Sequence, residues 1–181
     1  MLLDAQRASL LLVDVQERLL PAMLEPERVL ARTGILLKAA AELALPITIS
    51  EQYPKGLGRT VAELKSNSAV IFEKLSFSCW RDEAMKSHFV EMHDNGRPQV
   101  IVAGIEAHVC VLQTCLDMAQ AGFAVYAVAD AVSSRQQNAM DLAFKRMGQS
   151  DVQVINTEMA VFELLGKAGT PAFKVLSALI K

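Results

Sequence analysis

The chain has 181 residues, of which 52% are hydrophobic and 21% charged, so it can bury a sizeable core in one domain spanning residues 1–181. A formal net charge of −2 and the absence of a basic run argue against a nucleic-acid partner. No apolar stretch approaches the length of a membrane span, so we expect no membrane partner.

The amino terminus and the cysteines bear on the cellular compartment. The segment MLLDAQR has an early acid and no apolar core, so it does not resemble a signal peptide. The three cysteines are odd in number and lack the spacing of a metal site. A reducing compartment is the simplest expectation. We expect a cytoplasmic protein, with a mitochondrial location as the alternative.

Apolar runs and helical patterns alternate along the chain. The runs predict strands at 9–15, 47–49, 69–74, 100–102, 123–129 and 152–155. Helices are predicted at 27–45, from Thr60, at 82–92, from 107, from Ser133 or Ser134 to 147, at 157–165 and at 171–180. This alternation predicts an α/β fold: a three-layer α/β/α, Rossmann-like single domain with a parallel sheet.

The stretch from Val100 to Leu116 has the pattern of a strand, a tight turn and a helix. This geometry presents nucleophiles at the carboxyl edge of a parallel sheet, and it places Cys110 in the first helical turn. The positive end of the helix dipole favours a thiolate there, so we expect a lowered thiol pKa. Free backbone N–H groups of that turn could hold an oxyanion. The alternative is a buried structural cysteine.

Two more charged residues stand where an apolar run stops. Asp14 ends the run SLLLVDV, and Lys74 ends the run AVIFEK. Because strand ends lie side by side at one sheet edge, Asp14, Lys74 and Cys110 could converge. Asp14 could accept the thiol proton and return it to a leaving group, while Lys74 would stabilise the thiolate. The alternatives are a turn or cap residue for Asp14 and a solvated strand end for Lys74.

Five further residues are candidates for the wall of a substrate pocket. They are Gln16, Tyr53, Phe77, Trp80 and Ile105. Gln16 could orient Asp14 or touch the ligand. Tyr53 lies in a Gly- and Pro-rich loop over the same edge, which could also be an ordinary connection. One of Phe77 and Trp80 is expected in the core. The set is neutral, so we expect no strong selection for a charged substrate.

Three motifs resemble, in the right order, the signatures of the isochorismatase-like cysteine hydrolase family: Asp14 in LLVDVQ, Lys74 in FEK and Cys110 in GIEAHVCV. SEQYPKGLGRTVAEL and DAVSSR are similar to the isochorismatase domain-containing subgroup. The resemblance covers nearly the whole chain. It implies the sheet order 3-2-1-4-5-6, an Asp14–Lys74–Cys110 triad and a homo-oligomer. It also implies a cis peptide at Ile105–Glu106, which would turn the N–H of Glu106 towards the oxyanion beside that of Cys110.

The sequence departs from the family's nicotinamidases at the loop after the second strand. Those members bind a divalent metal there with an Asp/His cluster. Here the loop is Ser50-Glu51-Gln52-Tyr53, and Glu51 alone cannot make such a site. We therefore expect no metal and no cofactor. We assign His108 no catalytic role; it could face either the pocket rim or a subunit contact.

The sequence thus predicts a metal-free cysteine hydrolase that acts on a small amide through a thioester on Cys110. The substrate is a small molecule whose identity the sequence does not specify. One alternative is a non-catalytic binding or scaffold protein with a vestigial pocket. Another is thiol redox chemistry. Cys110 and Cys115 lie five apart on one helix, a poor geometry for a disulfide, whereas Cys79 could approach Cys110.

Overall fold

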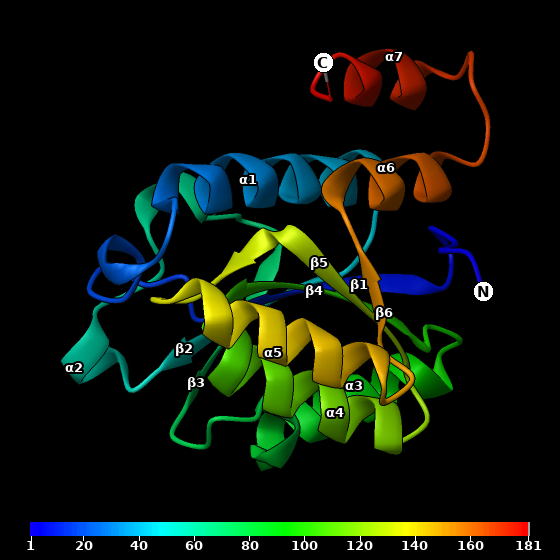
Figure 1. Cartoon of the computed structure of the whole chain (residues 1–181). Coiled ribbons are helices and arrows are strands. Elements are labelled where there is room, and N and C mark those ends of the chain that lie inside the picture. The colour runs from blue at the N-terminus through cyan, green and yellow to red at the C-terminus, as the bar shows by residue number, and fades with distance from the viewer. Residues whose placement is uncertain (181) are drawn as a thin grey trace.

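Six parallel strands form one sheet in the computed structural model, which describes residues 1–180 (Figure 1). The strands are β1 (Ala8–Val13), β2 (Ile47–Gln52), β3 (Ala69–Lys74), β4 (Gln99–Ile105), β5 (Ala124–Ser133) and β6 (Gln153–Ile155). Their order is β3-β2-β1-β4-β5-β6. The predicted sheet order is therefore confirmed. β1 and β4 are buried along their whole length, as expected for central strands with near-continuous apolar runs.

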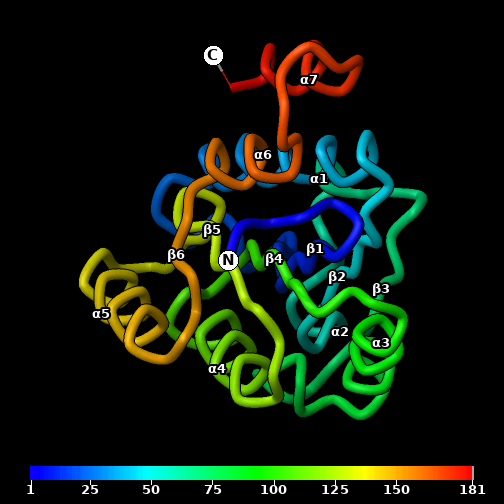
Figure 2. Tube along the Cα trace, turned by 90° about the vertical axis from the view of Figure 1, so that its right-hand side faces the viewer, coloured from blue at the N-terminus to red at the C-terminus, as the bar shows by residue number. Residues whose placement is uncertain are grey.

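Helices cover both faces of the sheet (Figures 1 and 2). On one face lie α1 (Pro26–Glu42) and α6 (Thr157–Leu165), with α7 (Pro171–Ser177) outside them. On the other lie α3 (Glu83–Asp94), α4 (Leu112–Gln120) and α5 (Gln137–Gly148). Leu10 and Leu12 of β1 belong to one hydrophobic cluster, and Leu11 and Val13 belong to another. Successive side chains of β1 thus point to opposite faces of the sheet and pack into two separate cores, which confirms the three-layer α/β/α class.

Short turns complete the chain. A short helix, α2 (Pro54–Leu57), follows β2, and 3-10 turns span Leu20–Ala22, Ala62–Leu64 and Cys79–Arg81. A π-helical turn, Ala107–Val111, links β4 to α4. Within residues 1–180, no helix has both the length and the apolar character to cross a bilayer.

β2 is longer than predicted. It continues to Gln52, because Glu51 and Gln52 are buried polar residues with partners rather than loop residues. The carboxylate of Glu51 accepts hydrogen bonds from the backbone N–H of Thr60, at 2.7 Å, and from its hydroxyl, at 2.8 Å. Thr60 therefore does not cap a helix as predicted.

β5 is also longer than predicted, and neither Ser133 nor Ser134 caps α5. Ser133 belongs to β5, and its hydroxyl donates to the carbonyl of Leu24 at 2.6 Å. The hydroxyl of Ser134 pairs with Nδ1 of His108 at 2.9 Å. Because both side chains have other partners, α5 begins later, at Gln137.

The strand register aligns the residues of the carboxyl edge. Val13 of β1 lies opposite Ser50 of β2 and Gly104 of β4, and Gln52 lies opposite Lys74 of β3. Gly104 has a φ of 125°, and a Cβ there would overlap the carbonyl oxygen of Val13. Only glycine lets β4 approach β1 this closely at the edge that carries the candidate site.

Candidate active site

A buried ion pair joins the ends of β1 and β3. Asp14 follows β1 directly and has a φ of 53°. Lys74 is the last residue of β3, and its Nζ lies 2.8 Å from Oδ2 of Asp14. Neither side chain is exposed to solvent. The structure thus brings together two of the three residues that were predicted to converge, in a pair that is shielded from water.

The ammonium group of Lys74 is surrounded by acceptors. Besides Asp14, it donates to Oε1 of Gln52 at 2.7 Å and to the carbonyls of Ser76 and Phe77 at 3.2 and 3.1 Å. Burial, the largest single influence, lowers the pKa of Lys74. The opposing charge of Asp14, together with its hydrogen bond to the ammonium group, favours the charged form, and the pKa of Lys74 is raised overall. Lys74 is therefore a permanent cation at neutral pH.

Cys110 lies in the π-helical turn after β4 and is 7% exposed. Burial raises the pKa of its thiol, the charge of Asp14 raises it further, and the charge of Lys74 lowers it. The net direction is upward, so the expected low pKa is not found in the resting site. Desolvation and a neighbouring carboxylate outweigh the helix dipole and the lysine, and the resting sulfur is a thiol.

The residues before Cys110 shape the backbone beside it. The peptide bond between Ile105 and Glu106 is cis. The carbonyl of Glu106 accepts hydrogen bonds from the N–H groups of Val109 and Val111, at 3.1 and 3.2 Å. The carboxylate of Glu106 pairs with Nε of Arg135 at 2.8 Å. The backbone carbonyl and the side-chain carboxylate of Glu106 are therefore both fixed next to the turn that holds the sulfur.

Known proteins resemble this chain both in sequence and in fold. The family model described as "Isochorismatase domain" matches residues 8–159, which include Asp14, Lys74 and Cys110. The chain belongs to the isochorismatase family. "Isochorismatase domain-containing protein 2" of Danio rerio is 38% identical over 178 residues, covering 98% of this chain and 89% of that protein.

Two solved structures of the same fold are also similar. The "MAR1 Ribonuclease from Caenorhabditis elegans" has a TM-score of 0.92 and 34% identity, covering 99% of this chain and 92% of that one. The YcaC gene product from Escherichia coli, described as "an octameric hydrolase of unknown specificity", has a TM-score of 0.92 and 26% identity, covering 99% and 90%. These relatives support a hydrolase fold, although one is described as a ribonuclease and the other as a hydrolase of unknown specificity.

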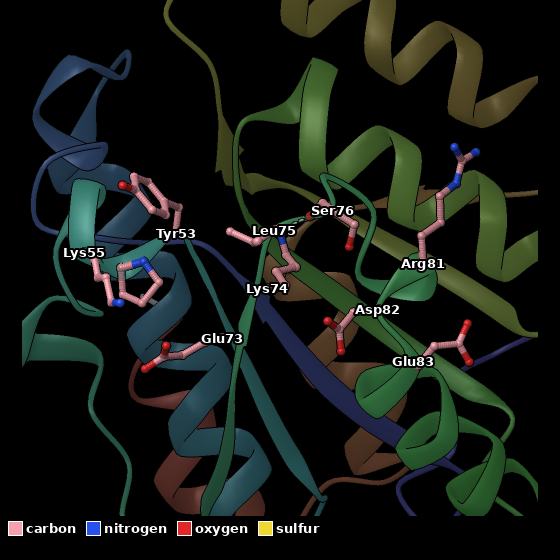
Figure 3. Close-up of a pocket in the computed structure, with 10 residues that line it drawn as sticks. Tyr53, Lys55, Glu73, Lys74, Leu75, Ser76, Arg81, Asp82 and Glu83 are labelled. Atoms are coloured by element: carbon pink, nitrogen blue, oxygen red, sulfur yellow. Dashed lines mark hydrogen bonds between the residues drawn. The ribbon is translucent and has the colours of Figure 1, made fainter.

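In this member of the isochorismatase family, a cavity of about 650 Å³ lies beside the lysine (Figure 3). Its lining residues are Tyr53, Pro54, Lys55, Glu73, Lys74, Leu75, Ser76, Arg81, Asp82 and Glu83. The lining does not include Asp14 or Cys110. Tyr53 is 52% exposed, and Phe77, whose carbonyl binds Lys74, is 55% exposed. Of the five predicted pocket residues, Tyr53 alone is on this lining, because Phe77 meets Lys74 only through its backbone carbonyl.

Gln16, Ile105 and Trp80 also lie outside the lining of this cavity. Gln16 is wholly buried, and its amide nitrogen donates to the carbonyls of Gln52 and Gly58, at 3.0 and 2.7 Å. Ile105 is fully buried in the core. The ring of Trp80 packs 5.3 Å from that of Phe123, which precedes β5 at the opposite edge of the sheet. The two hydrogen bonds of Gln16 thus connect the end of β2 to the loop at Gly58.

Sequence reasoning gave no role to Ser50 or to the side chain of Gln52. The hydroxyl of Ser50 donates to Oδ1 of Asp14 at 2.7 Å, and Gln52 binds Lys74. Both were assigned to a loop, because polar residues at a strand end resemble one. The alignment of strand ends at a parallel sheet edge is the signal that could have found them.

The residues that the family's nicotinamidases would use for a metal have other partners here. Within residues 1–180, no group of three or more His, Cys, Asp or Glu is placed to hold an ion. Glu51 is bound to Thr60 and Arg59. The absence of a metal from the working protein stays a prediction.

Proposed function

We propose that this protein is a metal-free cysteine hydrolase that cleaves a small amide through a thioester on Cys110. The observation that carries the proposal is the buried Asp14–Lys74 pair, with its 2.8 Å separation, close enough to Cys110 that each charge shifts the thiol pKa. A buried ion pair is costly to desolvate, so its position beside a nucleophile favours a chemical role.

The raised pKa of the Cys110 thiol shapes the first step. Because the sulfur is protonated at rest, it needs a base as it attacks the carbonyl carbon of the amide. Asp14 accepts that proton, and Lys74 stabilises the charge that the sulfur and Asp14 share during the transfer. The C–N bond then breaks, and Asp14 gives the proton to the departing nitrogen.

Water completes the cycle. It attacks the thioester carbon, its proton passes to Asp14, and the C–S bond breaks to release the acid. Asp14 then returns the proton to the sulfur of Cys110, so every proton is accounted for. In this proposal the backbone N–H groups of Glu106 and Cys110 hold the oxyanion in both steps. Support comes from their place beside the nucleophile, after β4 and in the π-helical turn.

The cavity favours a small, overall uncharged substrate. Its lining carries three basic side chains and the same number of acidic ones: Lys55, Lys74 and Arg81 against Glu73, Asp82 and Glu83. One solved relative is described as a ribonuclease, but the net charge of −2 gives little attraction for a polyanion. We therefore keep a small amide as the proposed substrate and treat RNA as an arm of the test.

The test is a mass measurement on the intact protein. The chain is incubated with a panel of small primary and N-substituted amides, with a short RNA in parallel, and quenched with acid. We expect an acyl adduct on Cys110 for at least one amide, with release of amine and acid, and neither in Cys110→Ala. Cleavage of the RNA that persists in Cys110→Ala, with no amide turned over, would contradict the proposal.

We further propose that the protein works as a cytoplasmic homo-oligomer. A structural relative is described as octameric. Here Leu75 and Tyr53, both on the cavity lining, are 75% and 52% exposed, and Phe77 in the same loop as Leu75 is 55% exposed. Burying such apolar side chains at a subunit contact is favourable. Sedimentation velocity should show a species larger than the 19.7 kDa monomer, and a purely monomeric protein would contradict this proposal.

A further inference from the structure

We propose that Ser50 is a positioning residue for Asp14, and that the buried thiol of Cys79 fixes the direction in which Ser50 donates its hydrogen bond. This inference rests on the proposed hydrolase function, in which Asp14 takes and returns the proton of Cys110. It adds two residues, from β2 and from the 3-10 turn before α3, to the working parts of the site.

Two hydrogen bonds with Ser50 hold Asp14 in place. The hydroxyl of Ser50 donates to Oδ1 of Asp14 at 2.7 Å, and the carbonyl of Ser50 accepts from the backbone N–H of Asp14 at 3.1 Å. Lys74 occupies the other carboxylate oxygen, Oδ2, at 2.8 Å. With a donor on each oxygen, from β2 and from β3, the carboxylate cannot rotate about its Cβ–Cγ bond without losing a bond.

Cys79 determines which way the serine hydroxyl points. Its Sγ lies 3.5 Å from Oγ of Ser50 and donates to it. A hydroxyl has one proton, and an ionised carboxylate only accepts. The hydroxyl of Ser50 therefore donates its hydrogen bond to Asp14, while its oxygen accepts a hydrogen bond from the thiol of Cys79. Burial raises the pKa of the Cys79 thiol to about 11, so the thiol remains a donor at neutral pH.

The backbone ties Cys79 to the helix that follows the nucleophile. The N–H of Cys79 donates to Oγ1 of Thr114 at 2.9 Å. Thr114 lies in α4, four residues after Cys110 and therefore one turn further along the same face. Cys79, Ser50 and Thr114 are all buried. This chain of contacts thus connects the carboxylate of Asp14, through Ser50 and Cys79, to the helix that directly follows the turn holding the sulfur.

The test uses variants at Ser50 that differ in hydrogen-bond strength at nearly constant volume. Ser50→Ala removes the donor, and Ser50→Cys keeps a weak one. The readout is the pH profile of Cys110 acylation by p-nitrophenyl acetate, followed by nitrophenolate release, with Cys110→Ala as background. We expect Ser50→Ala to slow acylation by about 10- to 100-fold, because hydrogen bonds to charged groups have that strength. Ser50→Cys should be intermediate.

The shape of the pH profile separates positioning from a structural role. A carboxylate that loses a donor holds its proton more tightly, so the acid limb should move to higher pH in Ser50→Ala. The ester concentration that gives half-maximal acylation should stay unchanged, because Ser50 is buried. An unshifted acid limb with wild-type acylation in Ser50→Ala would overturn the inference, with the proposed function intact.

Double variants test the part of Cys79. Cys79→Ala should slow acylation less than Ser50→Ala does, and Cys79→Ser, which keeps a donor, should restore it. In the Ser50→Ala background Cys79→Ala should add nothing, since Cys79 acts through Ser50. Additive losses would overturn that part. If wild type is acylated no faster than Cys110→Ala, the proposed function itself fails, and this inference fails with it.

Discussion

The two halves of the site differ in how much of their structure is already fixed. The half built on β1, β2 and β3 holds Asp14 and Lys74 in a closed set of hydrogen bonds, with both side chains unexposed. The other half consists of exposed side chains: Tyr53 on the cavity lining and Phe77 in the loop after β3 are each more than half exposed. In the proposed hydrolase, the charged pair is therefore already in place and shielded from water, while the substrate would meet exposed side chains.

Replacing Lys74 should have the largest effect on stability. Lys74→Met keeps the length of the side chain but leaves Asp14 buried without its cation, which costs about 3–5 kcal/mol of unfolding free energy. The matched control is Lys55→Met, which removes an exposed lysine on the lining of the same cavity. Urea unfolding of both variants measures the difference. Equal losses of unfolding free energy would show that the buried half contributes no more to stability than the exposed lining of the cavity.

The same pair predicts how stability depends on alkaline pH. Because the folded-state pKa of Lys74 is raised, its contribution is complete below the unfolded value of about 10.4 and is lost as pH rises through the folded value. Wild type should therefore lose unfolding free energy above that pH, and Lys74→Met should lose less over the same interval. Parallel curves would contradict the assignment.

Gln52→Ala should have an intermediate effect. It removes one acceptor from Lys74 and the bond from Gln52 to the carbonyl of Leu75, so the loss should be about 1–3 kcal/mol. Gln6→Ala, at an exposed position, is the control. Urea unfolding measures the loss of unfolding free energy in both variants. A loss no larger than that of the control would mean that Gln52 is not part of the closed half.

Phe77→Ala should have the smallest effect on folding. Its ring is exposed, so the change in unfolding free energy should stay within about 0.5 kcal/mol. If the exposed ring contacts the substrate, as the sequence predicts, without touching the reacting atoms, the KM for any amide identified as a substrate should rise while kcat stays the same. A fall in kcat at constant KM would move Phe77 from the rim into the chemical half.

The sequence was sufficient for the parts of the site that follow from strand ends. Asp14 and Lys74 each stop an apolar run, and parallel strand ends share one edge, so their meeting could be predicted. Ser50 and Gln52 could not be, because a polar strand end looks like a loop until its buried partners are known. The ring of Trp80 was placed by tertiary packing on Phe123, which periodicity does not encode.

The thiol of Cys110 shows the same limit for electrostatics. The helix dipole and Lys74 were visible in the sequence, and both favour the thiolate. The desolvation that opposes them depends on how deeply the π-helical turn sits in the fold, and it is the largest influence on the pKa. The sign of that shift therefore needed the structure.

The most direct test of the account is the pH-dependence of Cys110 alkylation by iodoacetamide in wild type, Asp14→Asn and Lys74→Met. Asp14 raises the thiol pKa and Lys74 lowers it. Asp14→Asn should therefore alkylate faster than wild type at pH 8, although amide acylation falls by about 10²- to 10⁴-fold without the base. Lys74→Met should alkylate more slowly. Identical alkylation profiles in all three proteins would contradict the claim that Asp14 and Lys74 act on Cys110.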